Sequence, residues 1–252
     1  MKMLSPFLRE LSLKEAPENR EEYPFSIPAL HEANLHMTFP TPVTFFVGEN
    51  GSGKSTVMEA IAIGCGFNPS GGSRNNTYDH VSTESSLAKL IRLVWNFKMT
   101  YGFFLRAESF FNFASHVDVM KEEAMAHKLG GDPYAPYGGK SLHVSSHGES
   151  FMALFENRFS RGIYLLDEPE AALSPTRQLV FLARLHELVK SRDAQFIIAT
   201  HSPILLSYPG ATIYSFDDHG IKPVTYEETE HFRVTKDFLN AHESFYKHLL
   251  ED

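Results

Sequence analysis

The segment GENGSGKST, residues 48–56, restricts the possible folds of this 252-residue chain more than any other feature. It follows the apolar run VTFFV and opens the stretch KSTVMEAIAIGCGF, in which apolar residues recur at helical spacing. Gly48 to Ser55 fit the pattern G-x-x-x-x-G-K-[ST] without deviation. A glycine turn before an ordinary core helix is the alternative, but the flanking strand and helix are the context that the pattern requires. The segment predicts a strand, a phosphate-binding loop and a helix.

The residue types of this loop match what nucleotide phosphates and their metal ion need. Glycines let backbone N–H groups turn toward phosphate oxygens, and the helix N-terminus adds its positive end. We expect Lys54 to reach the β and γ phosphates and the Ser55 hydroxyl to bind Mg²⁺, while Thr56 adds a phosphate contact. The predicted cofactors are ATP and Mg²⁺, and the other nucleotide-binding positions of the loop are Asn50, Gly51, Ser52 and Gly53.

Two later apolar runs end in polar residues suited to phosphate cleavage. GIYLL is followed by Asp167, expected beside the metal, and by Glu168, expected to take the proton of an attacking water. An acidic pair at a strand end is otherwise a solvated turn. His201 follows the run AQFIIAT and could hold the γ-phosphate or the water. The helix SPTRQLVFLARLHELVKS between the two runs suits a right-handed crossover. The sequence thus predicts an ATPase with Lys54, Glu168 and His201 as catalytic residues.

Alternation of strands and helices along the chain predicts an α/β fold, a P-loop NTPase with a mostly parallel sheet covered by helices. Residues 1–42 are rich in Pro and Glu, and short apolar stretches such as YPFSIPAL are expected to form edge strands and loops. A small N-terminal antiparallel β lobe is therefore predicted over residues 1–45. We expect a buried strand in YGFFLRAESFF, a loose connection over residues 120–145, a strand in ATIYSF and one or two helices in the C-terminal tail. Glu227, Glu228 and Glu230 of that tail are expected to be solvated.

Composition excludes several classes of protein. The net charge of -8 argues against a chain that coats nucleic acid with its whole surface, although a local basic patch stays compatible with it. No apolar run is long enough for a membrane helix, so we expect no membrane insertion and a cytoplasmic protein. Cys65, the single cysteine, lies in the apolar stretch AIAIGCGF and is expected to be a small core residue.

Taken together, the motifs GENGSGKS, SSHGES, LLDEPEAALSP and ATHSP resemble those of the ATP-binding-cassette ATPases. Within that class the chain is more similar to the soluble SMC and RecF-like group than to transporter subunits, over about residues 40–216. With no heptads between its halves, it resembles a compact stand-alone ATPase of AAA or ABC type from bacteria. The resemblance implies a single ATPase domain, with the β lobe over 1–45 and a Walker A half over 46–119. A helical signature subregion over 120–160 and a Walker B and His half over 161–252 complete it.

The resemblance also implies a site shared by two chains. Ser146, Gly148 and Glu149 match the S-x-G-E signature that closes over the nucleotide held by a partner subunit. A serine hydroxyl and a glycine N–H at a helix start form an anion site on physical grounds as well, although an ordinary N-cap has the same composition. The implied assembly is an ATP-dependent head-to-tail homodimer, with residues Ala172 to Ser174 at its interface.

The chain departs from the family pattern at two places. No Gln follows the strand GFFLRAES, so Glu108 or Ser109 substitutes for it or the role is absent. The segment AALSP lacks the usual aspartate. The favoured function is an ATP hydrolase acting on DNA or on a partner protein, in genome maintenance or defence. An energising transporter subunit, disfavoured by THSP, SHGE and the missing Gln, and a nucleotide-sensing module with little turnover are the alternatives.

Three other sets of residues allow two interpretations each. His143 and His147 are four residues apart, but no cysteine or carboxylate cluster accompanies them, which favours surface roles over a metal site. Arg74 contacts nucleotide or nucleic acid, or is simply solvated in its glycine-rich loop. Tyr23 or Phe25 stacks on adenine, or both belong to the core.

Overall fold

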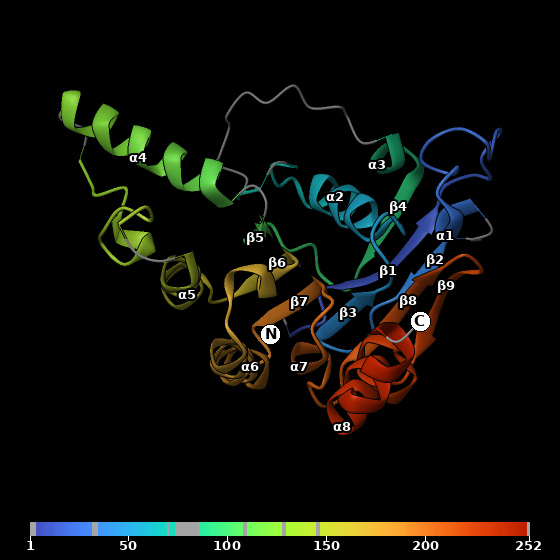
Figure 1. Ribbon diagram of the computed structural model, residues 1–252. Coiled ribbons are helices and arrows are strands. Elements are labelled where there is room, and N and C mark those ends of the chain that lie inside the picture. The colour runs from blue at the N-terminus through green and yellow to red at the C-terminus, as the bar shows by residue number, and fades with distance from the viewer. Residues whose placement is uncertain are drawn as a thin grey trace.

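The structure, a computed structural model, describes residues 4–31, 35–69, 71–73, 86–107, 110–127, 130–144 and 147–250. Strands alternate with helices along most of the chain (Figure 1). The strands are β1 Leu8–Leu13, β2 His36–Thr38, β3 Val43–Val47, β4 Ile91–Trp95, β5 Gly102–Arg106, β6 Gly162–Asp167, β7 Ala194–Ala199, β8 Thr212–Asp217 and β9 Gly220–Val224. The α-helices are α1 Pro28–His31, α2 Lys54–Cys65, α3 Ser86–Leu90, α4 Phe110–Ala126, α5 His147–Arg158, α6 Pro175–Lys190, α7 Pro203–Leu206 and α8 Glu230–Leu250. Short 3₁₀ turns cover Ala135–Tyr137, Pro169–Ala172 and Tyr226–Glu228.

A six-stranded sheet in the order β5-β6-β7-β3-β8-β9 forms the centre of the molecule. All neighbouring pairs are parallel except β8 and β9, which form an antiparallel hairpin. The central strands β3, β6 and β7 are buried along their whole length, as expected for parallel strands that are covered on both faces. The predicted α/β class with a mostly parallel sheet is confirmed.

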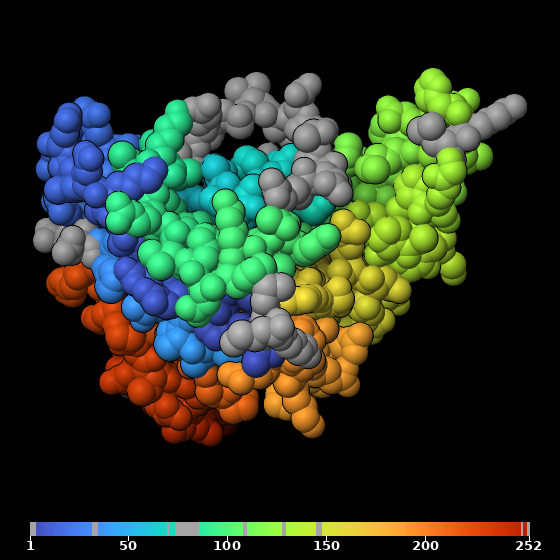
Figure 2. Space-filling view, turned by 180° about the vertical axis from the view of Figure 1, so that it is seen from behind, coloured from blue at the N-terminus to red at the C-terminus, as the bar shows by residue number. Residues whose placement is uncertain are grey.

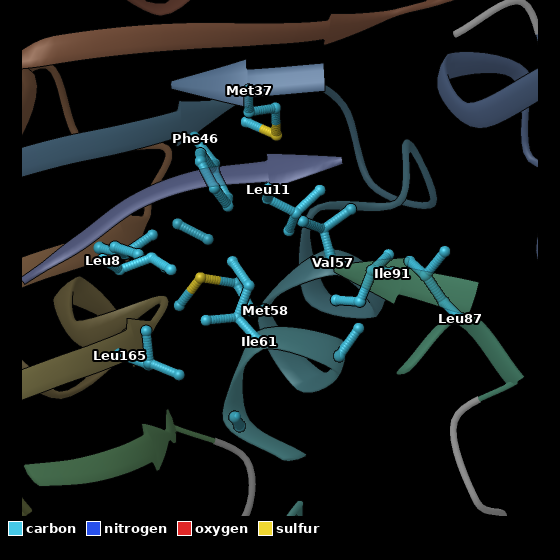
Figure 3. Packing of buried hydrophobic residues seen from close by; sticks show 14 of the residues in the cluster. Leu8, Leu11, Met37, Phe46, Val57, Met58, Ile61, Leu87, Ile91 and Leu165 are labelled. Atoms are coloured by element: carbon cyan, nitrogen blue, oxygen red, sulfur yellow. The ribbon is translucent and has the colours of Figure 1, made fainter. Parts of the chain in front are cut away.

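Side chains of alternate residues on these strands enter two different hydrophobic clusters. On β6, Ile163 and Leu165 join a cluster with α2, whereas Tyr164 and Leu166 join a second cluster with α5 and α6. Figure 3 shows the first cluster, with Met58 and Ile61 of α2 between the main sheet and the strands of the β lobe. The main sheet is therefore the middle layer, and its carboxyl edge is fixed by packing on both faces.

The small antiparallel lobe is present, but its composition differs from the prediction. Its three strands have the order β2-β1-β4, so the third strand comes from residues 91–95, beyond the expected range of 1–45. The stretch YPFSIPAL, expected to contribute edge strands or loops, contains helix α1. Pairing with β4 provides hydrogen-bond partners for the backbone groups on the second edge of β1. A lobe made only of strands from residues 1–45 would leave these groups unpaired.

The buried strand expected in YGFFLRAESFF is present but shorter, and the loose connection expected over residues 120–145 is wrong for its first residues. Strand β5 ends at Arg106, and Phe110 already begins helix α4, because the apolar residues of FFNFASHV recur at helical spacing. Helix α4 continues to Ala126, so residues 120–126 are helical and do not belong to a loose connection. Helix α4 projects from the main body at the opposite side from α8 (Figures 1 and 2).

The C-terminal part adds one element that was not predicted and one that was. Strand β9 was missed because GIKPV is short and contains a proline, although an edge strand tolerates one. The tail is helical, as expected, and bends at Ala241, whose φ of -145° is not helical. Within the described residues, no helix combines the length and apolar character that crossing a membrane would require.

Candidate nucleotide site

The loop between β3 and α2 has the backbone conformation that its glycines permit. Gly48, Gly51 and Gly53 have φ values of 146°, 81° and 97°, in the region that residues with a Cβ avoid. A Cβ at Gly48 would lie 2.3 Å from the Phe216 carbonyl oxygen, so β8 packs directly on the loop. Gly53 is the residue before α2, and the loop therefore brings its amides to a helix N-terminus. This geometry is that of an anion-binding loop.

Lys54, at the start of α2, is almost fully buried, with 4% of its surface exposed. Its Nζ donates to the carbonyl oxygens of Gly48 and Glu49, at 2.7 and 2.9 Å. Burial lowers the pKa of Lys54, and the carboxylates of Glu168 and Asp167 act in the opposite direction. A buried ammonium group costs free energy unless it is paired. Lys54 is thus held inside the loop, with its charge available to an anionic ligand.

Ser55 and Asp167 meet as the sequence predicted. The Ser55 hydroxyl donates to Asp167 Oδ1 at 3.3 Å, which joins the start of α2 to the end of β6. Arg106, opposite Asp167 in the β5-β6 register, places its Nε 3.6 Å from Oδ2 of that carboxylate and Nη1 3.8 Å from Oε2 of Glu59. Ser55, Arg106, Asp167 and Glu168 line a small cavity of about 70 Å³. Hydroxyl and carboxylate oxygens of this kind are the ligands that Mg²⁺ prefers.

Glu168 and His201 lie together at the carboxyl ends of adjacent strands. Glu168 Oε1 is 3.5 Å from Nε2 of His201, and the Glu168 side chain is 44% exposed. Glu168 has left-handed backbone angles, φ 54° and ψ 51°, which are costly for a residue with a Cβ. Its N–H still donates to the Ala199 carbonyl at 2.9 Å. The backbone therefore turns sharply after Asp167, and the two carboxylates are presented at the same edge of the sheet.

Two further residues fix His201 in place. Oε1 of Glu170 accepts from the backbone N–H of His201 at 2.6 Å. Burial raises the pKa of Glu170, and the hydrogen bond from His201 opposes that shift. The His201 ring contacts His231 of α8, with 2.9 Å between Nδ1 of His201 and Nε2 of His231. The loop after β7 is thus tied to the 3₁₀ turn after β6 and to α8.

The start of α5 lies apart from this edge of the sheet. A Cβ at Gly148 would lie 2.4 Å from Nη1 of Arg177 and 2.7 Å from the Ala172 carbonyl oxygen. Glu149 forms an ion pair with Arg177 at 3.3 Å. Ser146 lies outside the described residues. The helix start is therefore packed against residues 172–177, and neither Gly148 nor Glu149 lines the cavity next to Ser55 and Asp167.

A cavity of about 310 Å³ adjoins the phosphate loop on its other side. It lies between Glu49 and Ser52 of the loop, the β8-β9 hairpin and the first turn of α8, where His231 and Arg233 contribute to the lining. Of the two residues considered for adenine stacking, Phe25 is buried in the core with 3% exposure, so it offers no free face. Tyr23 is 63% exposed.

The structure describes some of the remaining candidate residues, such as His143 and Cys65, but not all of them. Glu108, Ser109 and Arg74 lie outside the described residues. The His143 ring packs against Phe111 at 4.6 Å, and the described residues contain no group of three or more His, Cys, Asp or Glu residues placed to hold a metal. Cys65 is buried, and burial raises its pKa to about 12, which confirms its role as a core residue.

The structure adds four polar residues to the site and its surroundings that the sequence did not indicate: Arg106, Glu170, Arg177 and His231. The position of Arg106 as the last residue of a strand next to β6 would have suggested a contact with Asp167, had the end of that strand been predicted correctly. The sequence contains no signal for His231, because it follows His201 by thirty residues and enters the site only through the packing of α8.

Comparison with protein families gives two matches, each of which contains part of the described site. Residues 26–109 match the model of an AAA domain, and residues 141–206 match the model of an AAA ATPase domain. The first match contains the phosphate loop, and the second contains Asp167, Glu168 and His201. The chain thus contains two segments that are similar to AAA-type ATPase domains. A search of the curated proteins finds no match to this chain.

Solved structures with a similar fold include cassettes and a head domain. An ATP-binding cassette of an ABC transporter is 16% identical, with coverage of 94% of this chain and 98% of its own and a TM-score of 0.48. The SMC head domain from Thermotoga maritima is 17% identical, with coverage of 86% and 99% and a TM-score of 0.44. A bacterial ABC transporter cassette in dimeric form is 16% identical, with coverage of 78% and 90% and a TM-score of 0.44.

Proposed function

We propose that the chain binds ATP with Mg²⁺ and hydrolyses it. The observation that carries this proposal is the meeting of Lys54, Ser55, Asp167, Glu168 and His201 at one edge of the sheet. In this proposal Asn50, Gly51, Ser52, Gly53 and Thr56 contact the phosphates, together with Lys54. The γ-phosphate bond lies near Glu168 and His201.

The donor set fits a hard cation. Ser55 and Asp167 supply one hydroxyl and one carboxylate oxygen within hydrogen-bond distance of each other, and they would hold Mg²⁺. When bound, Mg²⁺ supplies charge stabilisation to the phosphate oxygens. Arg106 contacts the same carboxylate from β5, so it is placed to balance the charge of Asp167 before the metal binds. Lys54, whose pKa is lowered by burial, gains an anionic partner when the phosphates enter.

Glu168 is the best candidate for the base that accepts a proton from the attacking water. It is the more exposed of the two adjacent carboxylates, whereas Asp167 is 6% exposed and engaged with Ser55. A carboxylate within hydrogen-bond reach of the water takes its proton as the bond to the γ-phosphate breaks. His201 Nε2, 3.5 Å from Glu168, is placed to bind a γ-phosphate oxygen.

We further propose that ATP joins two copies of the chain head to tail. Gly148 and Glu149 begin a helix away from the phosphate loop, and a second copy would bring this helix start, with Ser146, over the nucleotide. The contact of Gly148 with Ala172 and Arg177 supports a common surface that includes Ala172–Ser174. The partner acted on by this dimer is DNA or a protein. A transporter-energising role is the alternative, and recovery of a membrane permease with the chain would favour it.

The test combines ATP hydrolysis and oligomeric state in wild type, Glu168→Gln and Ser146→Arg. We expect Glu168→Gln to accumulate as an ATP-bound dimer, and Ser146→Arg to lose both the dimer and turnover while its melting temperature stays that of wild type. Hydrolysis by a wild-type monomer that Ser146→Arg does not change would contradict the shared site. Absence of ATP binding by the wild type, with Lys54→Ala as the control, would contradict the function itself.

A further inference from the structure

His231, in the first turn of α8, contacts the side of His201 that faces away from Glu168. Nε2 of His231 is 2.9 Å from Nδ1 of His201, and the ring centroids are 5.0 Å apart. On the other side of the His201 ring, Nε2 is 3.5 Å from Glu168 Oε1. The three side chains thus form a continuous row from α8 to the carboxylate that we propose as the base.

The chemistry of this row favours one arrangement of protons. A hydrogen bond between two imidazole rings needs one N–H and one bare nitrogen. If His231 donates from Nε2, His201 accepts at Nδ1 and carries its own proton on Nε2, which lies 3.5 Å from Glu168 Oε1, an ion-pair distance without a hydrogen bond. In the reverse arrangement His201 would present a bare nitrogen to an oxygen that only accepts. The first arrangement places an N–H group near the carboxylate, which is electrostatically favourable, whereas the second places a nitrogen lone pair there.

The surroundings of His231 support its neutral, donating form. Its Nδ1 is buried and, among the residues that the structure describes, has no hydrogen-bond partner. A charged ring would place a second N–H at this position without an acceptor. Burial and the neighbouring His201 both lower the pKa of His231, and Lys54 acts in the same direction. Glu49 and Glu230 oppose this shift.

The turn that carries His231 is fixed to the segment after His201. The Tyr226 hydroxyl donates to the Pro203 carbonyl at 2.9 Å, and the Tyr226 ring packs on Phe232 at 4.5 Å. Thr229, 2% exposed, donates from its hydroxyl to the Tyr226 carbonyl at 2.7 Å. These contacts anchor the first turn of α8, so the His231 ring has a defined position relative to His201.

We infer that His231 is a positioning residue: by donating to Nδ1 of His201, it keeps the His201 proton on Nε2, facing Glu168 and the γ-phosphate position. The inference rests on the proposed function for the identity of that phosphate. Histidines whose second nitrogen is bound by a partner keep one tautomer and one ring orientation. The same contact joins the γ-phosphate position to the start of α8 through two side chains.

The proton positions are measured directly by NMR. Long-range proton-nitrogen spectra of protein with ¹⁵N-labelled histidine, recorded above the ordinary histidine pKa, show which nitrogen of each ring carries the proton. His201→Gln and His231→Gln assign the two rings. We expect His201 to be protonated on Nε2 in wild type and to lose this fixed state in His231→Leu. A wild-type His201 protonated on Nδ1, or an identical His201 signal in His231→Leu, would overturn the inference.

Kinetics supply the second measurement. His231→Leu should lower kcat by about 10- to 100-fold, the usual effect of removing a group that orients an imidazole, and leave KM for ATP unchanged. His231→Gln should restore most of kcat because its side-chain amide can donate to the same nitrogen. His242→Leu, on the exposed part of α8 beyond the bend, is the matched control and should equal wild type.

The outcomes separate the inference from the proposed function. Equal kcat in His231→Leu and His242→Leu, both folded by circular dichroism, would overturn the positioning role. Failure of His231→Gln to restore kcat where the leucine variant loses it would overturn the donor mechanism. Absence of turnover in the wild type would overturn the proposed function, and the NMR measurement would still decide whether His231 sets the His201 tautomer.

Discussion

Replacement of Glu168 by glycine should make the nucleotide-free protein more stable and at the same time inactive. Glu168 has φ 54° and ψ 51°. Among the described residues, Glu168 and Arg192 are the non-glycine residues with positive φ. Left-handed backbone costs a residue with a Cβ about 1–2 kcal/mol. Glycine removes that cost but loses about 0.5–1 kcal/mol through its greater freedom in the unfolded chain. The difference is a gain of between about 0 and 1.5 kcal/mol.

Loss of the side chain itself subtracts part of this gain. Glu168 is 44% exposed and its contact with His201 spans 3.5 Å, and such an exposed pair contributes between about 0 and 1 kcal/mol. For a chain of this size, 1 kcal/mol corresponds to about 2–4 °C in Tm. The assay is a thermal melt of the nucleotide-free protein, run beside steady-state phosphate release. Loss of the base should reduce kcat by about 10²- to 10⁴-fold.

Two further variants separate strain from catalysis. Glu168→Gln keeps the left-handed cost and the side-chain shape, so it should lose turnover without a gain in Tm. Arg192→Gly is the matched control, since Arg192 has φ 56° and lies on the surface after α6. It should gain a similar Tm and keep full turnover. The strain argument is refuted if Glu168→Gly melts below wild type while Arg192→Gly melts above it, and the assignment of the base is refuted if both Glu168 variants hydrolyse ATP normally.

Three other predictions follow from the same contacts. Gly48→Ala should destabilise the fold by more than about 2 kcal/mol in urea unfolding, because its Cβ would lie 2.3 Å from the Phe216 carbonyl oxygen. Gly51→Ala has no atom within 4 Å of its new Cβ, so it should be destabilised only by its left-handed backbone, by about 1 kcal/mol. Equal destabilisation of the Gly48→Ala and Gly51→Ala variants would contradict the packing argument. The lowered pKa of His231 means that the unfolded chain binds its proton more readily, so stability should fall as pH drops below the ordinary histidine pKa. In thermal melts across this pH range, His231→Gln should reduce the pH dependence of stability, and an unchanged profile would contradict the prediction. The other charged or titratable groups that act on the His231 ring are His201, Lys54, Glu49 and Glu230, and the variant retains all of them. Cys65, with a pKa of about 12, should react with a thiol reagent at neutral pH only after unfolding, and rapid reaction of the native protein would contradict its burial.

The sequence was sufficient for the parts of the fold that depend on local pattern and on strand chemistry. The phosphate loop, β3, β6, β7 and the crossover helix α6 are found where the apolar runs and glycines placed them. Glu168 and His201 follow different strands, yet their proximity was expected from the rule that carboxyl ends of parallel strands meet at one edge of the sheet. That rule needs only the order of strands and helices along the chain.

The parts that were missed depend on long-range packing. The third strand of the β lobe comes from residues 91–95, and its pairing with β1 depends on how α2 brings the two segments together. The sequence placed Phe110 in a strand because FF continues the apolar run of β5. In the structure, Phe113 and Val117, one and two helical turns after Phe110, are buried on the same face of helix α4. His231 reaches the site only because the tail folds back over the loop after β7.

The charges around Lys54 give a physical reason for a site completed by a second chain. The carboxylates of Asp167, Glu168 and Glu170 lie near Lys54. Within a single chain, these negative charges therefore offset much of the positive charge that Lys54 presents to a phosphate group. ATP carries more negative charge than Lys54 and one Mg²⁺ neutralise, and this carboxylate-rich edge disfavours a bare γ-phosphate. Arg177, which packs beside the helix start at Gly148 and lies 3.3 Å from Glu149, places a guanidinium on another surface of the same chain. In the proposed head-to-tail arrangement, we expect Arg177 to supply positive potential to this edge, so dimerisation should depend on the γ-phosphate. An Arg177→Ala variant that dimerises with ATP as wild type does would contradict this account.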